Sequence, residues 1–373
     1  MKSLPSALML AATLTGCAAM GPGTISANRP AYNTAVQQTN DQELLLNLVR
    51  IRYRDTLYFT SVERIAASQE FGQSLGASAL AATTNNSFVI PPSAPGPAIS
   101  NLLTRTFTLG PASITSYEKP TVFYAPLEGE KFVRQMMTPM NPDLLLLLIK
   151  SGWSLDRVFS VGVQEMNGLK NAPTATGTTP SREPEFHDFR EAVKLLRALQ
   201  REQLLELVKP AGAEGIELRF IRSAAQREET VQLKKLLGLS AKRERFQILS
   251  GSDNASPETI VLSTRPLLSA LTYLSQGVDV PAADIKAGKV RQTVRNSGET
   301  FDWQELLEGV FHVQVSDNRP EDASVVVPYR GSYFYIADND LESKSTFVLL
   351  TQLMALHSSP PSPGPAMSFS FGK

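Results

Sequence analysis

Apolar residues recur along this chain at two spacings, one typical of helices and one typical of strands. Leu44, Leu45, Leu48 and Ile51 follow the helical spacing, which predicts an amphipathic helix over residues 41–54. The same pattern predicts helices over residues 132–137, 144–149, 189–209, 228–237, 266–274 and 343–356. Runs of β-branched and aromatic residues predict strands over residues 57–66, 105–109, 121–124, 153–163, 216–221, 246–249 and 259–262.

Turn residues divide these elements. An Asn-Pro-Asp sequence at residues 141–143 supplies an N-cap and a proline at the first helical position of the next helix, and Gly152 ends that helix. A β-hairpin is predicted where the strands 325–329 and 332–336 flank Gly331. Because helices and strands follow one another in mixed order, we expect an α+β fold of mixed sheets with amphipathic helices.

Segments without helix or strand periodicity also predict a domain organisation. Residues 18–40 lack periodicity and are interpreted as a flexible tether, and the proline-rich end of the chain is interpreted as a tail in which residues 367–371 could form a short strand. The expected segments are a signal peptide (1–16), a lipidated tether (17–40), an N-terminal subdomain (41–170), a linker (171–186), a C-terminal subdomain (187–357) and a tail (358–373).

Residues 71–97 are unusually rich in Ala, Ser, Thr, Asn and Gly, and they end in a proline-rich run. Two interpretations remain open. The stretch and its neighbours form either a long hairpin with a proline-rich tip, or a disordered surface loop between two strands of a globular sheet.

The first residues resemble a lipoprotein signal. Lys2 precedes a short apolar stretch, which is too short to span a bilayer but has the length of a signal-peptide core. The sequence Leu-Thr-Gly-Cys that ends at Cys17 resembles the lipobox of bacterial lipoprotein precursors. The resemblance implies that the Cys17 thiol is acylated and that the signal is cut before it. Ala18, where an Asp would favour the inner membrane, implies the outer membrane; the alternative is an ordinary secretory signal with a coincidental cysteine.

Composition narrows the partners. The chain has 373 residues, of which 42% are hydrophobic, and its 36 basic and 36 acidic residues balance. No basic face therefore indicates nucleic acid or an anionic lipid surface. Cys17 is the only cysteine, so no disulfide is expected. The expected partners are the membrane, through lipidated Cys17, and an envelope protein or a cell-wall glycan.

Two stretches of the body, residues 121–130 and 329–336, resemble uncharacterised envelope lipoproteins of double-membraned bacteria. The resemblance implies no activity.

Catalysis has little support. Residues 116–119 fit S-x-x-K and residues 316–318 fit S-D-N, two motifs of penicillin-binding serine enzymes. However, Pro120 disfavours helical geometry at Lys119, a second S-D-N occurs at residues 252–254, and no K-T-G follows. We therefore expect no catalytic residue and no enzyme.

Metal and cofactor sites are not expected either. The three histidines, His187, His312 and His357, have no partner at metal-ligand spacing. The acidic residues Asp338, Asp340 and Glu342 alternate, but the glycine and the distal Glu of a calcium loop are missing. They are interpreted as a solvated turn and helix cap.

One group of residues is a candidate binding patch: Tyr329, Arg330, Tyr333 and Tyr335. Such residues could stack on sugar rings or receive a partner side chain. The alternative, which we favour, is that these aromatic residues pack the final helix onto the sheet.

The leading hypothesis is a non-enzymatic, lipid-anchored periplasmic protein of the outer membrane that supports or assembles an envelope structure. The alternative is a subunit of an oligomeric outer-membrane pore or export complex, in which hairpins from several copies close a barrel. A hydrolase without a recognisable site is a third hypothesis.

Overall fold

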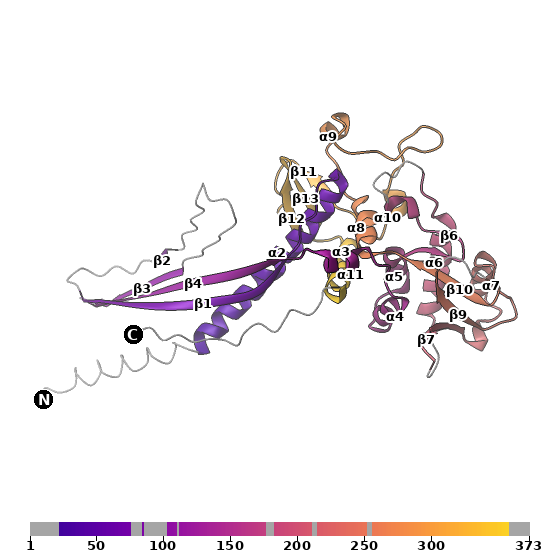
Figure 1. The fold of residues 1–373 in the computed structure, drawn as a ribbon, viewed down its shortest axis with the longest axis horizontal. Coiled ribbons are helices and arrows are strands. Elements are labelled where there is room, and N and C mark those ends of the chain that lie inside the picture. Colours follow the sequence, from indigo (N-terminus) through magenta and orange to yellow (C-terminus); the bar gives the residue numbers. More distant parts are fainter. Residues whose placement is uncertain are drawn as a thin grey trace. The chain divides into compact units, whose positions relative to one another are not determined.

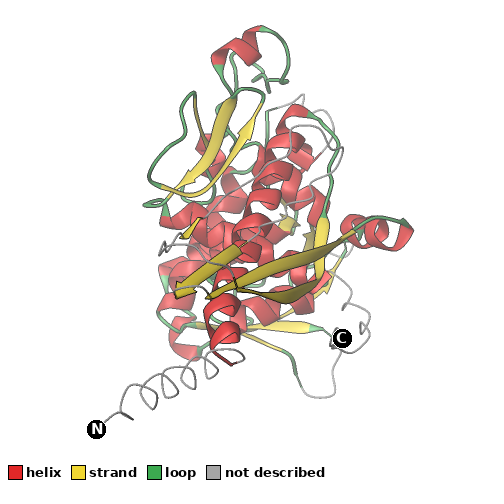
Figure 2. Cartoon of the chain, turned by 90° about the vertical axis from the view of Figure 1, so that its left-hand side faces the viewer, coloured by secondary structure: helices red, strands yellow, loops and turns green. Residues whose placement is uncertain are grey.

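The computed structural model describes residues 22–75, 84–85, 103–109, 112–176, 183–210, 215–251 and 256–357. It confirms the predicted α+β class, with helices and strands interspersed (Figure 2). The chain divides into two compact units: Met1–Leu57 with Glu128–Ser359, and Tyr58–Leu127 with Pro360–Lys373. We call the first the body and the second the hairpin unit.

The body begins with a long helix, α2 (Pro22–Tyr53), of 32 residues (Figure 1). At 1.5 Å per residue it is about 48 Å long. Leu45, Leu48 and Val49 are fully buried near its end, and the helix packs against α8 and β12. The prediction of a flexible tether up to residue 40 is wrong from Pro22 onward. Forming the first turn is the costly step of helix formation, and the buried C-terminal end of α2 stabilises it. The helix then extends toward the N-terminus through the preceding segment, which contains Ala and Gln.

The hairpin unit is a four-stranded antiparallel sheet with the strand order β1-β4-β3-β2 (Figure 1). Its strands are β1 (Thr60–Leu75), β2 (Thr84–Asn85), β3 (Leu103–Leu109) and β4 (Ala112–Pro126). β1 and β4 pair from Thr60 opposite Pro126 to Leu75 opposite Ala112. Of the two interpretations of this region, the described backbone has the long hairpin. The strands are longer than predicted because pairing extends through polar residues, and the proline-rich run lies outside the described residues.

Three helices follow the hairpin unit: α3 (Glu130–Met137), α4 (Pro142–Lys150) and α5 (Leu155–Gly162). The predicted cap of α4 is confirmed, since Asn141 Oδ1 accepts a hydrogen bond of 2.9 Å from the Asp143 amide. The strand predicted over residues 153–163 is wrong, because most of it is α5. Leu155, Val158 and Phe159 are buried at helical spacing, and packing of this stripe outweighs the β-branched composition.

A six-stranded sheet forms the centre of the remaining body, with the order β6-β5-β10-β9-β8-β7. The strands are β5 (Val163–Met166), β6 (Leu169–Lys170), β7 (Leu205–Val208), β8 (Ile216–Phe220), β9 (Arg245–Ser250) and β10 (Thr259–Thr264). The β9–β10 pair is parallel and the other pairs are antiparallel.

This sheet crosses the subdomain boundary that the sequence predicts at residues 171–186. β5 and β6 precede that linker, yet β5 pairs with β10, with Leu262 opposite Met166. The linker composition reflects a local loop, whereas the division into units follows pairing between distant strands. The contacts instead separate the hairpin unit from everything else.

Several helices and strands of the second half agree with their predictions. The helix predicted over residues 189–209 ends earlier, as α6 (His187–Arg201), because Gln203 adopts a φ of +57° and β7 follows. α7 (Glu228–Leu236), α8 (Leu267–Ser275) and α11 (Leu341–His357) are confirmed, while α9 (Ala282–Lys286) and α10 (Gln304–Leu307) were not predicted.

The predicted C-terminal hairpin is also confirmed, as β12 (Ala323–Tyr329) and β13 (Ser332–Ala337), with β11 (Gln314–Ser316) on the other edge of β13. Arg330 and Gly331 have φ values of +49° and +89°. Positive φ at both central positions is typical of a type I′ turn, which matches the twist of the strands it joins.

Candidate functional site

The turn of the β12–β13 hairpin lies against the end of α2. The Tyr329 hydroxyl donates a hydrogen bond to Asp55 Oδ2, and Arg330 Nη2 donates to the same oxygen at 2.9 Å. The ring of Tyr329 packs edge-on against Tyr53, with ring centroids 5.5 Å apart. The Arg330 guanidinium lies 5.1 Å from the centroid of the Tyr53 ring. Half of the predicted binding patch is thus engaged by the helix.

A second carboxylate completes this cluster. The buried Tyr53 hydroxyl donates to Asp284 Oδ2 at 2.7 Å, and Lys289 Nζ lies 2.6 Å from Asp284 Oδ1. Hydrogen bonds from Lys289 and Tyr53 lower the pKa of Asp284. Hydrogen bonds from Tyr329 and Arg330 likewise lower the pKa of Asp55. Because the pKa of each acid is lowered, both acids are charged at neutral pH. Burial raises the pKa of Tyr53, which therefore donates to Asp284 as a neutral phenol.

The two remaining patch residues lie on the other face of β13. Tyr333 and Tyr335 alternate with the buried residues Phe334 and Ile336, so they share one half-exposed face. The Tyr335 hydroxyl donates to Gln314 Oε1 of β11 at 2.8 Å. The structure therefore divides the predicted patch: Tyr329 and Arg330 join α2, and Tyr333 and Tyr335 face away. The interpretation favoured from the sequence, that these aromatic residues pack the final helix onto the sheet, is wrong for Tyr329, because its ring packs against Tyr53 of α2.

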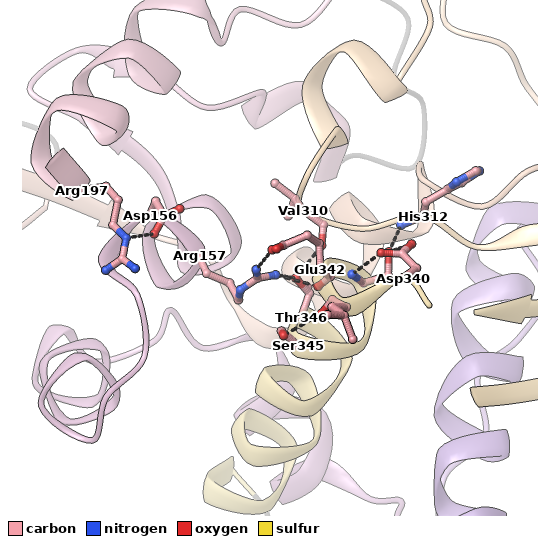
Figure 3. Close-up of polar contacts among 11 residues, drawn as sticks. Asp156, Arg157, Arg197, Val310, His312, Asp340, Glu342, Ser345 and Thr346 are labelled. Carbon is pink, nitrogen blue, oxygen red and sulfur yellow. Dashed lines mark hydrogen bonds and ion pairs between the residues drawn. The ribbon is translucent and has the colours of Figure 1, made fainter. Parts of the chain in front are cut away.

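The acidic residues of the predicted turn each have a separate partner. Asp338 Oδ1 lies 2.6 Å from Lys344 Nζ, and Asp340 accepts hydrogen bonds from the Ser343 amide and hydroxyl at the start of α11. Glu342 points toward Arg157 of α5 (Figure 3). The three carboxylates therefore do not converge. The described residues contain no cluster of His, Cys, Asp and Glu suited to a metal ion.

Arg157 joins α5 to α11. Its Nη1 donates to the Glu342 carbonyl at 2.7 Å and to Thr346 Oγ1 at 2.6 Å (Figure 3). Thr346 in turn donates to the carbonyl of Val310. The network orients the last helix, and the donors and acceptors named here are used within it.

The histidines are dispersed. His187 is exposed and its ring lies 4.2 Å from that of Phe186, while His357 is the last residue of α11. His312 Nε2 lies 2.9 Å from Asp279 Oδ2, and this hydrogen bond raises the pKa of His312. The His312 amide also donates to Ser343 Oγ at 2.8 Å. That serine contacts the backbone of the histidine rather than its ring, which does not form a nucleophile–base pair.

The serine and lysine of the S-x-x-K motif both lie in β4. Ser116 pairs with Phe71 and Lys119 with Ser68 across the β1–β4 ladder. Positions three apart in a strand lie on opposite faces, whereas this motif requires one helix face. In the S-D-N motif, the Asn318 amide donates to Ser316 Oγ at 3.2 Å, a local turn interaction. The second S-D-N, at residues 252–254, lies outside the described residues.

One buried cation was missed by the sequence analysis. Arg265 is fully buried and donates to the carbonyls of Ser160, Val163 and Asn171. Its guanidinium lies 4.0 Å from the centroid of the Tyr273 ring. Burial lowers its pKa to about 10. These carbonyls all lie within residues 160–171, about 100 residues before Arg265, so the arginine joins the end of β10 to α5, β5 and the segment after β6. No local pattern signals this.

A hollow of about 730 Å³ lies beside the start of α6. Its lining includes Lys170, Glu183, Glu185, His187 and Asp188. Lys170 pairs with Glu185 at 3.1 Å, and Glu183 pairs with Arg295 at 3.0 Å. Two of the three acidic residues in the lining are therefore already paired with a basic residue, and the third, Asp188, lies in the first turn of α6.

The hairpin unit remains as the candidate interaction surface. Directly opposite positions of an antiparallel pair share one face, so the register sorts its residues into two sets. The more apolar set comprises Ile65, Ala67, Phe71, Leu75, Leu103, Phe107, Leu109, Ala112, Ile114 and Val122, with Gln69, Gln73, Arg105, Ser116 and Glu118 among them. The opposite set is rich in hydroxyl residues: Ser68, Ser74, Thr104, Thr106, Thr108, Ser113, Thr115 and Thr121.

The chain has no match among protein-family models, curated proteins or solved structures. Within the described part of the chain, no helix combines the length and apolar composition that crossing a membrane requires.

Proposed function

We propose that this chain is a lipid-anchored envelope protein that acts by binding, with the hairpin unit as its contact surface for an envelope partner. The observation that carries this proposal is the hairpin unit itself. It is a separate compact unit in which β1 and β4 pair along their whole length, and its described elements include no helix. It carries exposed aromatic residues, since Tyr58 and Tyr124 are 54% and 49% exposed. Aromatic residues are enriched at protein interfaces.

In the body, the residues that the sequence marks as candidates for chemistry make structural contacts, which favours a binding role over catalysis. Tyr329, Arg330 and Glu342 make structural contacts, and Asp340 caps a helix. None of these groups meets a second reactive side chain in a geometry typical of catalysis. A non-enzymatic role is therefore the simplest proposal for this protein.

The anchor is proposed from the resemblance of the sequence ending at Cys17 to a lipobox. Two acyl chains are enough for stable membrane attachment, so no membrane-spanning helix is needed. Metabolic labelling with a fatty acid tests this part. The wild type should be labelled and should sediment with membranes, and the Cys17→Ser variant should lose both properties; label that persists in Cys17→Ser contradicts the anchor.

Photo-cross-linking tests the contact surface. A photoreactive residue at Tyr124, in the hairpin unit, is compared with one at Val231, which is 55% exposed on α7 of the body. We expect one discrete adduct from position 124 in intact cells and none from position 231. Equal adducts from both positions, or from position 231 alone, would contradict a role for the hairpin unit.

A pore subunit is the second candidate, favoured by one observation. Each copy contributes four antiparallel strands, an even number, so successive copies could join into a closed antiparallel sheet. Arg105 and Glu118 oppose it, because their register places them within the more apolar set. A basic residue facing lipid at mid-bilayer costs about 2–4 kcal/mol. Protein purified without acyl chains should stay a monomer or small oligomer without detergent; a large detergent-dependent ring would support the pore.

A further inference from the structure

Among the strands that the structure describes, β1 has a partner on one side only. In the order β1-β4-β3-β2, β1 is an edge strand, and it pairs with β4 alone among the described strands. An edge strand of 16 residues presents a long row of backbone donors and acceptors that can pair with another strand. Natural proteins usually shorten, cover or charge such an edge.

One segment of β1 has opposite charges at its two ends. Beyond the irregularity between Val62 and Arg64, β1 pairs regularly with β4 from Arg64 to Leu75. The segment from Arg64 to Glu70 reads Arg-Ile-Ala-Ala-Ser-Gln-Glu, with a basic residue at one end and an acidic residue at the other. If two copies of it align antiparallel about Ala67, Arg64 of each copy stands opposite Glu70 of the other. Small residues, Ala66 opposite Ser68 and Ala67 opposite itself, occupy the centre.

We propose that β1 pairs with β1 of a second copy of this chain, in antiparallel register centred on Ala67, so that two hairpin units form one continuous sheet. Such a contact is isologous and closes with two-fold symmetry, so it yields a dimer rather than a filament. Opposite charges at directly opposite positions favour this register, and a shift by two residues would place Arg64 opposite Ser68 or Gly72 instead of Glu70. Because the contact is formed by β1, it does not depend on the lipid anchor.

Site-directed disulfide cross-linking tests the register in the full chain, in membranes of the expressing cells. Directly opposite positions of an antiparallel pair have Cβ atoms about 4.5–5.5 Å apart, close to the separation that a disulfide requires. Ala67→Cys should therefore form a disulfide-linked dimer on mild oxidation. Ser74→Cys is the matched control, because position 74 would stand opposite position 60. Wild-type protein controls for Cys17.

A charge exchange tests the proposed pairs. In the Ala67→Cys background, Glu70→Arg makes both residues basic in each of the two pairs between positions 64 and 70. This repulsion should lower the dimer yield at least tenfold. Adding Arg64→Glu restores opposite charges and should restore the yield, which also shows that the strand still forms. Glu128→Arg, at an exposed position of the body, controls for net charge and should leave the yield unchanged.

The outcomes separate the alternatives. A dimer from Ala67→Cys but not from Ser74→Cys, lost and then restored by the charge exchange, supports the inference. A yield of disulfide-linked dimer no higher than that of the wild type would overturn it. This is the result expected if residues 367–371 of the same chain occupied the edge. Equal yields from both cysteines, failure of the double exchange, or a ladder of larger species would also overturn it. These results leave the labelling at Cys17 and the adduct at Tyr124 unaffected, so the two proposals fail separately.

Discussion

Tyr53 and Asp284, 231 residues apart in the sequence, meet in a buried hydrogen bond of 2.7 Å. This bond joins the last turn of α2 to α9. The chain leaves the body four residues after Tyr53, at Leu57, so the hydrogen bond fixes the helix close to the point where the hairpin unit begins.

Removing this hydroxyl should weaken the body. We expect Tyr53→Phe to lower the free energy of unfolding by about 1–2 kcal/mol, because Asp284 loses a buried donor. Urea unfolding followed by tryptophan fluorescence measures the change. Tyr124→Phe, at an exposed position, should change it by less than about 0.5 kcal/mol. Equal effects would show that the buried bond contributes nothing.

Arg265 should be far more sensitive than a surface arginine. Arg265→Ala leaves the carbonyls of Ser160, Val163 and Asn171 without this donor and removes a fully buried side chain. We expect a loss of at least about 3 kcal/mol. Arg227→Ala, which breaks an exposed pair with Glu202, should cost about 0–1 kcal/mol. Thermal unfolding of the two variants under the same conditions distinguishes them.

His312 should make stability depend on pH. Its hydrogen bond with Asp279 raises its pKa above the ordinary value of 6.5. A group with a raised pKa contributes its full stabilisation below the unfolded pKa and loses it as pH rises through the folded pKa. Wild-type stability should therefore fall from about pH 6.5 upward relative to His312→Gln.

The pH effect has a clear control. His187→Gln, at an exposed position, should keep the wild-type profile, whereas Asp279→Asn should reduce the slope. Unfolding free energies measured in urea between pH 5 and about pH 9 provide the comparison. A wild-type profile parallel to that of His312→Gln would contradict the role of this pair.

The residue after the lipid anchor should direct sorting. With Ala18 in place, we expect the wild type in outer-membrane fractions of a density gradient. Ala18→Asp should move a substantial part of the protein to the inner membrane, and Ala18→Ser is the conservative control. Wild-type protein already in the inner membrane would reject this prediction.

Local patterns predicted the elements whose causes are local. The apolar stripe of α6, with Phe189, Val193 and Leu196, depends on residues within a few turns of one another. The Asn141 cap and the turn at Gly331 likewise depend on neighbouring backbone geometry. Helical spacing, capping and positive φ are properties of short segments, so the sequence alone determined these features.

Tertiary structure decided what depends on distant partners. Residues 155–162 form a helix because one stripe of them is buried, although their β-branched and aromatic residues favour a strand. β5 joins β10 across the predicted linker, and Arg265 binds carbonyls about 100 residues away. Tyr329 and Arg330 became structural contacts because Asp55 and Tyr53 lie beside them in the fold. Burial and pairing partners are set by long-range packing, which a pattern read along the chain does not contain.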